Sequence, residues 1–464
     1  MCLHGVGPRG FAEVHFGKAE LGNRARTGRL VDLAERFARH PGGTLPEKLK
    51  SPAALKAAYR LMERKEVTHS AVLQPHRDET LRRVAQHDGP LVVIHDATEL
   101  DYSGLHSLQG LGQIGKGTRR GYLCQNSLVV DPQQREVMGL VNQVLYRRPQ
   151  APKKETKGQG RKRENRESLL WLRGVEGLPA DPRLVDVCDR GADTTEFLEH
   201  EAHSGRRFVI RSRHDRQIQP GHEGDLPRRP LRVFVRGLKS QGTREVQVSA
   251  GEERKARTAV AHVAFAPLRI IPPKQKRGNH GDQPLRLWVV REWEPDPPAG
   301  EEPLEWVLLT NEPVENFADA CRVLQWYECR WIVEEYHKAM KTGCNIEDMQ
   351  FTQETRLQPM IALLSVVALT LLRLRDASRR PDAQTRAATE VVDQDYVVVL
   401  NAWRYRHADT RMTIHEFFYA LARLGGHQNR KNDKLPGWLV LWRGWCELQA
   451  MTNGALAIQG AKLG

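Results

Sequence analysis

The sequence lacks the marks of a stapled, exported or membrane-spanning chain. Its seven cysteines are scattered and form no CxxC pair, which favours reduced thiols over disulfides or a zinc site. The longest run without a charge, 357–372, is shorter than the roughly 18 apolar residues that a membrane span needs, and it predicts a buried helix. The first residues show no apolar stretch behind a basic one, so we expect no secretory signal and a cytoplasmic protein.

What the chain has in excess is positive charge. Its 71 Lys and Arg residues outnumber its 57 Asp and Glu residues, and the net charge is +14. Such an excess favours a polyanionic partner, either nucleic acid or an anionic membrane surface. The 464 residues, 40% of them hydrophobic, suffice for about three domains of roughly 150 residues each.

The first 75 residues form a predicted helical module. Apolar residues recur at helical spacing, as at Leu30, Leu33 and Phe37, around a Pro-Gly-Gly break at 41–43. The segment also carries a cluster of basic side chains, at Arg24, Arg26, Arg29, Arg36 and Arg39. A DNA-binding module has this pattern, although a solvated helix face has it too.

Short apolar runs follow and predict a mixed α/β region over 76–384. Candidate core strands are 91–94, 127–130, 137–141, 184–188 and 208–210. Between about 215 and 300 the chain is rich in proline with alternating β signals at 232–236, 259–265 and 285–290, which predicts an inserted β subdomain. Helical patterning resumes near 315, and 385–464 forms a predicted C-terminal helical region.

Two carboxylates close apolar runs. Asp96 ends LVVIHD and Asp189 ends LVDVCD, so we expect both at the C-terminal ends of buried strands, where α/β folds place their sites. Each residue alone would also suit a turn former or a helix N-cap.

A third carboxylate lies in a segment of helical pattern. Tyr327, Arg330, Glu334 and Lys341 follow one another at i, i+3, i+7 and i+14, which predicts one stripe along a single helix. A structural alternative is an Arg330–Glu334 ion pair beside an exposed Lys341.

Together the three carboxylates match the needs of phosphoryl transfer with two divalent ions. Mg²⁺ prefers oxygen ligands and takes one or two carboxylates per ion, and Mn²⁺ can replace it. Two such ions activate an attacking oxygen and stabilise a leaving one. We therefore expect a two-metal site with nearby basic residues that hold a phosphate backbone.

The same residues carry a family resemblance. Tyr327-x-x-Arg330-x-x-x-Glu334 with Lys341, the string at 189–193 and Asp96-Ala97-Thr98 resemble the DDE transposases of the insertion-sequence-four family. Further strings that resemble this family lie along nearly the whole chain, at 21–30, 207–212, 303–310, 421–426 and 438–445.

The resemblance implies an α/β fold with an RNase H-like catalytic core, interrupted by the β insertion. It implies that Asp96, Asp189 and Glu334 are the catalytic metal ligands. It also implies that Tyr327, Arg330 and Lys341 contact terminal phosphates, and that Trp306 stacks on a flipped base, although a strand Trp is otherwise a core residue. The other expected DNA contacts are Arg26, Arg29, Arg211, Arg213 and Lys338.

The resulting hypothesis is a cut-and-paste DNA transposase. The module at 1–75 would bind the transposon ends, and the helices at 385–464 would pair two protomers on double-stranded DNA, with no membrane involved. Cleavage would proceed by nicking, hairpin formation and reopening, followed by insertion into target DNA. The alternatives are a catalytically silent DNA-binding inhibitor derived from a transposase and a metal-dependent nuclease with the same core.

Overall fold

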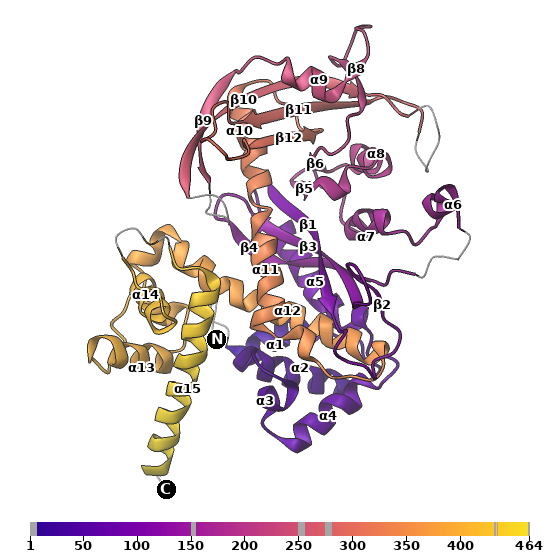
Figure 1. Cartoon of the computed structure of the whole chain (residues 1–464). Coiled ribbons are helices and arrows are strands. Elements are labelled where there is room, and N and C mark those ends of the chain that lie inside the picture. The colour runs from indigo at the N-terminus through magenta and orange to yellow at the C-terminus, as the bar shows by residue number, and fades with distance from the viewer. Residues whose placement is uncertain are drawn as a thin grey trace.

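The computed structural model describes residues 7–149, 155–248, 256–273, 281–430, 433 and 435–462. Its N-terminal region is helical, as predicted (Figure 1), with α1 (Pro8–Phe16), α2 (Arg24–Arg39), α3 (Leu45–Leu49), α4 (Pro52–Met62) and α5 (His69–Ala85). The side chain of Asn23 caps α2 by accepting a hydrogen bond from the backbone N–H of Arg26. The apolar face of α2, including Leu30 and Phe37, is buried against its neighbours.

The centre of the molecule is a sheet in which five strands lie in an unbroken block. These are β1 (Leu91–Asp101), β3 (Arg120–Asp131), β4 (Glu136–Tyr146), β5 (Leu184–Cys188) and β6 (Arg207–Arg211). Their spatial order is β4-β3-β1-β5-β6, in which β3 runs antiparallel to β1 and to β4, whereas β5 runs parallel to β1 and to β6. Each of the five predicted core strands lies within one of these elements.

Later strands extend the same sheet. They are β7 (Gln217–Pro220), β8 (Arg229–Pro230), β9 (Gly242–Val248), β10 (Arg257–Ile270), β11 (Leu285–Trp293) and β12 (Glu305–Thr310). Because β12 pairs with both β11 and β6, the β region joins the central block edge to edge. A short strand, β2 (Gly112–Gln113), pairs with β3 at the opposite side.

The strand predicted at 232–236 is wrong, because this segment is helix α9 (Leu231–Arg236). Leu231 and Val235 are buried four residues apart, as one face of a helix requires, while Val233 is 61% exposed. In a strand, Val233 and Val235 would share a face, so burial of only one of them favours the helix.

Other helices cover the sheet or follow it: α6 (Lys157–Lys162), α7 (Leu170–Val175), α8 (Thr195–His203), α10 (Phe317–Glu328), α11 (Trp331–Lys338), α12 (Glu354–Arg379), α13 (Gln394–Tyr405), α14 (Ile414–Leu424) and α15 (Trp438–Lys462). By length and composition α12 could cross a membrane, but 88% of its most apolar window is buried in the protein. It packs against α5, β4 and α15, and it is the buried helix predicted from 357–372. The C-terminal half of α15 extends away from the other helices in Figure 1.

Candidate functional site

Asp96 and Asp189 lie side by side because their strands are neighbours. Strands β1 and β5 pair in parallel from Leu91 to His95, with His95 opposite Cys188. Each aspartate is the next residue along its chain, so both carboxylates emerge where β5 ends. The expectation for Asp189 is confirmed, whereas Asp96 is not at the end of its strand, since β1 continues to Asp101 in its pairing with β3.

The segment with Tyr327, Arg330, Glu334 and Lys341 is not one continuous α-helix, so the prediction of a single helix is wrong. Helix α10 ends at Glu328 and α11 begins at Trp331, and Lys341 lies in a π-helical turn that follows α11. At the junction, the N–H groups of residues 329, 330, 332 and 333 bond to carbonyls three residues back. In such a tight turn residues three positions apart lie on one side, and Tyr327 and Arg330 are close enough to interact electrostatically.

Arg330 joins the first and third carboxylates. Its Nη1 lies 2.8 Å from Oδ2 of Asp96 and 3.5 Å from Oε1 of Glu334. Burial raises the pKa of Asp96 to about 6; Arg330 opposes this shift, and the charges of Asp189 and Glu334 add to it. The three carboxylates are therefore close enough to influence one another's charge. The Glu334 side chain is 41% exposed.

The residues around this group are basic and aromatic. The Arg211 side chain is hydrogen-bonded to Tyr327, and burial lowers its pKa with help from the positive charges of Arg190 and Arg330. The Trp306 ring meets the Tyr327 ring edge-on, with ring centroids 4.9 Å apart. Four of the predicted residues, from β6, β12, α10 and the junction, thus lie together beside the carboxylates, with Tyr327 buried among them.

The remaining predicted basic residues are less closely associated. Lys341 lies 3.5 Å from Glu347, with which it forms an ion pair. Arg213 is exposed just beyond β6, where its backbone N–H donates to Asp193. Lys338 is exposed and, with Glu334, lines a hollow of about 680 Å³.

The hollow, and the group formed by Arg211, Tyr327 and Arg330, have neighbours that the sequence reasoning missed. Trp331, 59% exposed, lines the hollow together with Arg135 from the β3–β4 turn. Arg190 lies next to Asp189 in the chain and near Arg211 in space. Trp331 and Arg190 each follow directly after a residue of the recognised strings, and this adjacency was a usable signal.

The carboxylates suit a hard divalent cation by their chemistry, since all of their donors are oxygens. In the part of the chain that the structure describes, no three His, Cys, Asp or Glu side chains are arranged to hold an ion. The Arg330 guanidinium lies between two of the three carboxylates.

A buried polar network lies behind the two aspartates. His95 contacts Asp186 through Nε2 and Ser127 through Nδ1, and Arg206 donates to the other oxygen of Asp186. Burial and the charge of Asp186 raise the pKa of Glu201 beside them. The network ties β1, β3, β5 and α8 together, close in the chain to Asp96 and Asp189.

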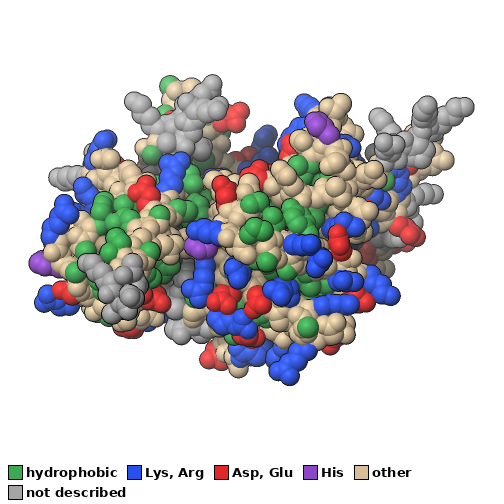
Figure 2. Space-filling view, turned by 90° about the horizontal axis from the view of Figure 1, so that it is seen from below, with side chains coloured by type: hydrophobic (Ala, Val, Ile, Leu, Met, Phe, Trp, Pro, Cys, Tyr) green, Lys and Arg blue, Asp and Glu red, His purple; other side chains and the backbone are tan. Residues whose placement is uncertain are grey.

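The predicted contacts in the N-terminal module differ in their surroundings. Arg26 donates to the Leu21 carbonyl and pairs with Glu66 at 2.8 Å, which ties α2 to the end of the module. Arg29 is exposed and lies 3.9 Å from Asp32. Figure 2 views the molecule from below, where these helices lie in Figure 1, and shows Lys and Arg side chains gathered there with Asp and Glu among them.

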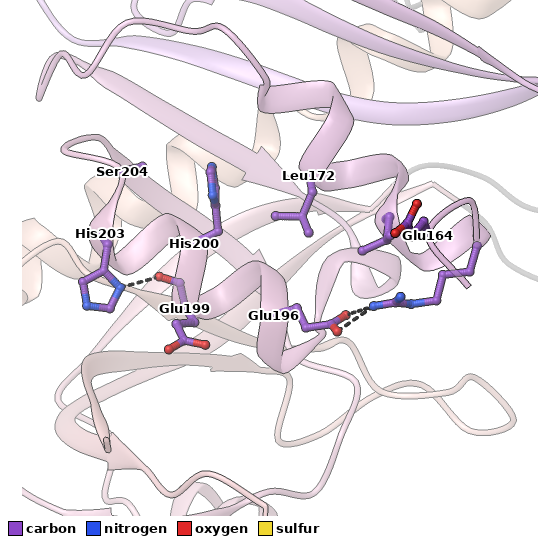
Figure 3. Close-up of a pocket in the computed structure, with 9 residues that line it drawn as sticks. Glu164, Leu172, Glu196, Glu199, His200, His203 and Ser204 are labelled. Carbon is purple, nitrogen blue, oxygen red and sulfur yellow. Dashed lines mark hydrogen bonds and ion pairs between the residues drawn. The ribbon is translucent and has the colours of Figure 1, made fainter. Parts of the chain in front are cut away.

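A second hollow, of about 530 Å³, lies between α7 and α8 (Figure 3). Arg166 donates to both oxygens of Glu196 on one side, and His203 contacts the Glu199 carbonyl on the other. None of the predicted site residues lines it.

Residues 8–67 match the family model for transposase DNA-binding domains. The matched region spans α1 to α4 and so coincides with most of the predicted helical module. The match supports a transposase-related role in which this region binds DNA.

Proposed function

We propose that this chain, whose first helices match a transposase DNA-binding domain, is a cut-and-paste DNA transposase of the DDE type in the insertion-sequence-four family. The observation that carries the proposal is the meeting of three carboxylates from distant parts of the sequence, with Asp96 and Asp189 on neighbouring strands and Glu334 joined to Asp96 through Arg330.

The strand order supports an RNase H-like core. Three antiparallel strands, β1, β3 and β4, are followed by two strands that lie parallel to β1, and the first two carboxylates emerge from β1 and beside the end of β5. The extension through β12 corresponds in this proposal to the β insertion between the second and third carboxylates.

In the proposed reaction Asp96, Asp189 and Glu334 would hold two Mg²⁺ ions, with Mn²⁺ as a substitute. Bound divalent ions supply activation of the attacking oxygen and stabilisation of the leaving one. The chain's own residues orient the strand: Arg211 and Arg330 offer planar guanidinium groups suited to phosphate oxygens, and Tyr327 lies between them.

The surroundings of Trp306 support its proposed stacking on a flipped base. Its ring packs on Tyr327 and is only partly buried, so one side of the indole can receive a base displaced from the end of the duplex. A hairpin at the transposon end bends one strand back sharply, and an aromatic platform beside the cleavage point would stabilise the extruded base.

The remaining parts recognise and pair the DNA ends. Exposed basic residues of α2 and α4 would contact the phosphate backbone and so fix the position of α2 on the DNA duplex. They are Arg24, Arg29, Arg36, Lys56 and Arg60. The helices of 385–464 would pair two protomers across two ends, and the protein would act in the cytoplasm, on DNA.

Excision from a donor plasmid tests this function. The plasmid carries the DNA that flanks the gene, and purified protein is added with Mg²⁺. We expect double-strand breaks at both ends with hairpins on the released fragment, none with Glu334→Gln, and normal breaks with the control Glu99→Gln, an ion-paired carboxylate on β1. Binding of the end fragments without cutting, under Mg²⁺ and Mn²⁺ alike, would favour the silent DNA-binding inhibitor.

A further inference from the structure

The Arg330 guanidinium occupies the space between two proposed metal ligands. Its Nη1 is 2.8 Å from Asp96 and 3.5 Å from Glu334, and the Arg330 and Asp96 side chains are only 15% and 14% exposed. A guanidinium and a divalent cation compete for the same carboxylate oxygens, and both neutralise the same negative charge. Arg330 therefore acts as an internal counter-ion for this group of carboxylates.

We propose that Arg330 keeps the carboxylate site closed in the DNA-free protein, and that a DNA phosphate opens the site to divalent cations by drawing Arg330 away. This inference rests on the proposed function, since it takes Asp96 and Glu334 as metal ligands. It adds that metal affinity depends on DNA.

The direction in which Arg330 moves follows from its neighbours. Arg211 lies close enough to both Arg190 and Arg330 for their charges to disfavour its own. Two of these guanidinium groups, those of Arg211 and Arg330, also interact with Tyr327 at the edge of the site. A phosphate placed among them relieves this repulsion and gives Arg330 a partner that replaces Asp96.

The junction between α10 and α11 suits such an exchange. Arg330 precedes the first residue of α11 and is held by three-residue hydrogen bonds, rather than lying inside a continuous helix. Its side chain can change partner by rotation about its own bonds, without movement of the backbone. Glu334, whose side chain is 41% exposed and lines the hollow of about 680 Å³, leaves an entry for an ion.

The exchange makes DNA and metal binding mutually favourable. If DNA removes a competitor for the carboxylates, then by linkage a bound cation must also tighten the contact with DNA. The free protein would thus have low metal affinity and little capacity for cleavage away from its proper ends.

Manganese binding to the DNA-free protein tests the inference. Free Mn²⁺ is measured by electron paramagnetic resonance during titration of the wild type, Arg330→Gln and the control Arg322→Gln, which alters an ion-paired arginine of α10 outside the carboxylate group. We expect Arg330→Gln to raise the Mn²⁺ affinity about tenfold or more, within the usual range of coupling between sites. Arg322→Gln should leave it unchanged, and Arg330→Gln with Asp96→Asn should lose the gain.

Equal Mn²⁺ affinity in the wild type and Arg330→Gln, with both lost on Asp96→Asn, would overturn the inference while leaving the metal site intact. Absence of any binding that depends on Asp96 would instead contradict the proposed function. If Arg330→Gln fails to fold by circular dichroism, Arg330→Met replaces it. Methionine keeps an unbranched side chain but removes the positive charge that competes with the cation, so an affinity above the wild type is again expected and an unchanged affinity overturns the inference.

Discussion

Nε2 of His95 lies 2.7 Å from Oδ1 of Asp186, and both side chains are fully buried between β1 and β5. Each residue lies close in its chain to a proposed metal ligand, His95 directly before Asp96 and Asp186 three residues before Asp189. A buried contact of this kind contributes less to net stability than to a unique arrangement of the two strands. We infer that it fixes the register that places the two aspartates together.

Asp186→Ala should destabilise the protein strongly. The substitution leaves Arg206, 5% exposed, with only the more distant Glu201 at 3.4 Å, and removing one partner of a buried ion pair costs about 3–5 kcal/mol. Urea unfolding measures the loss. Glu99→Ala is the control, because its exposed pair with Arg119 should be worth about 1 kcal/mol or less. If the two variants lose equal free energy of unfolding, the buried network contributes no more to stability than an exposed ion pair does.

Gly191→Ala should disturb the site without changing any charge. A Cβ at this position would lie 2.4 Å from the Trp171 ring, and the Gly191 N–H holds Oδ1 of Asp189 at 2.8 Å. Overpacking of this kind costs about 1–3 kcal/mol and would shift the Asp189 carboxylate. The melting temperature and DNA cleavage should both fall. Gly104→Ala, where the space is open, should have the melting temperature and cleavage rate of the wild type. Wild-type values for Gly191→Ala would contradict this prediction, because they would mean that Trp171 moves aside at little cost.

Acid should destabilise the fold through the buried pair His15 and His76. Burial lowers the pKa of His15 to about 3, and it lowers the pKa of His76 as well. Nε2 of His76 accepts from the Leu140 N–H, so Nδ1 of His76 carries the proton toward Nδ1 of His15, and the pair has no place for another proton. The contact joins α1 to α5.

The sign of the pH effect follows from these shifts. The unfolded chain takes up protons near its ordinary histidine pKa of about 6.5, whereas folded His15 does so only near 3. The contribution to stability is therefore present above about 6.5 and is lost as the pH falls toward 3, by up to about 1.4 kcal/mol per pH unit for each histidine. Urea unfolding at pH 7 and pH 5 should show this loss, with a smaller pH slope for His15→Gln. An equal slope in that variant would contradict the assignment.

Arg26 and Arg29 should respond differently to replacement by alanine. Arg29 is exposed, so Arg29→Ala should weaken DNA binding and reduce the slope of log affinity against log salt by about one. Arg26→Ala should mainly lower the melting temperature, because Arg26 holds Glu66 and the Leu21 carbonyl. Fluorescence anisotropy at several salt concentrations separates the two effects, and a larger salt-slope change for Arg26→Ala would reverse their roles.

Local pattern was enough to predict the helical N-terminal module, the five core strands and the buried helix α12. The apolar runs before Asp96 and Asp189 predicted that each aspartate follows buried strand residues, and the pairing of β1 with β5 accounts for their proximity. Alternation failed at 232–236, since Leu231 and Val235 are buried against neighbours that are distant in sequence.

Other features depend on tertiary structure. The break at Glu328–Trp331 follows no proline or glycine, and helical spacing could not indicate it. Arg330 lies between Asp96 and Glu334, although Arg330 and Asp96 are 234 positions apart in the sequence. The buried partners of His95 likewise became visible only when the strands were paired.

Cleavage of a short end-labelled duplex that carries the terminal sequence tests the central claim most directly. Binding without metal and cutting with Mg²⁺ are measured for the wild type, Asp96→Asn, Asp189→Asn and Glu334→Gln. We predict that all four proteins bind the duplex with similar affinity, because phosphate contacts dominate binding, and that only the wild type cuts it and forms a hairpin. Cutting at the wild-type rate by any of the three variants would contradict the account.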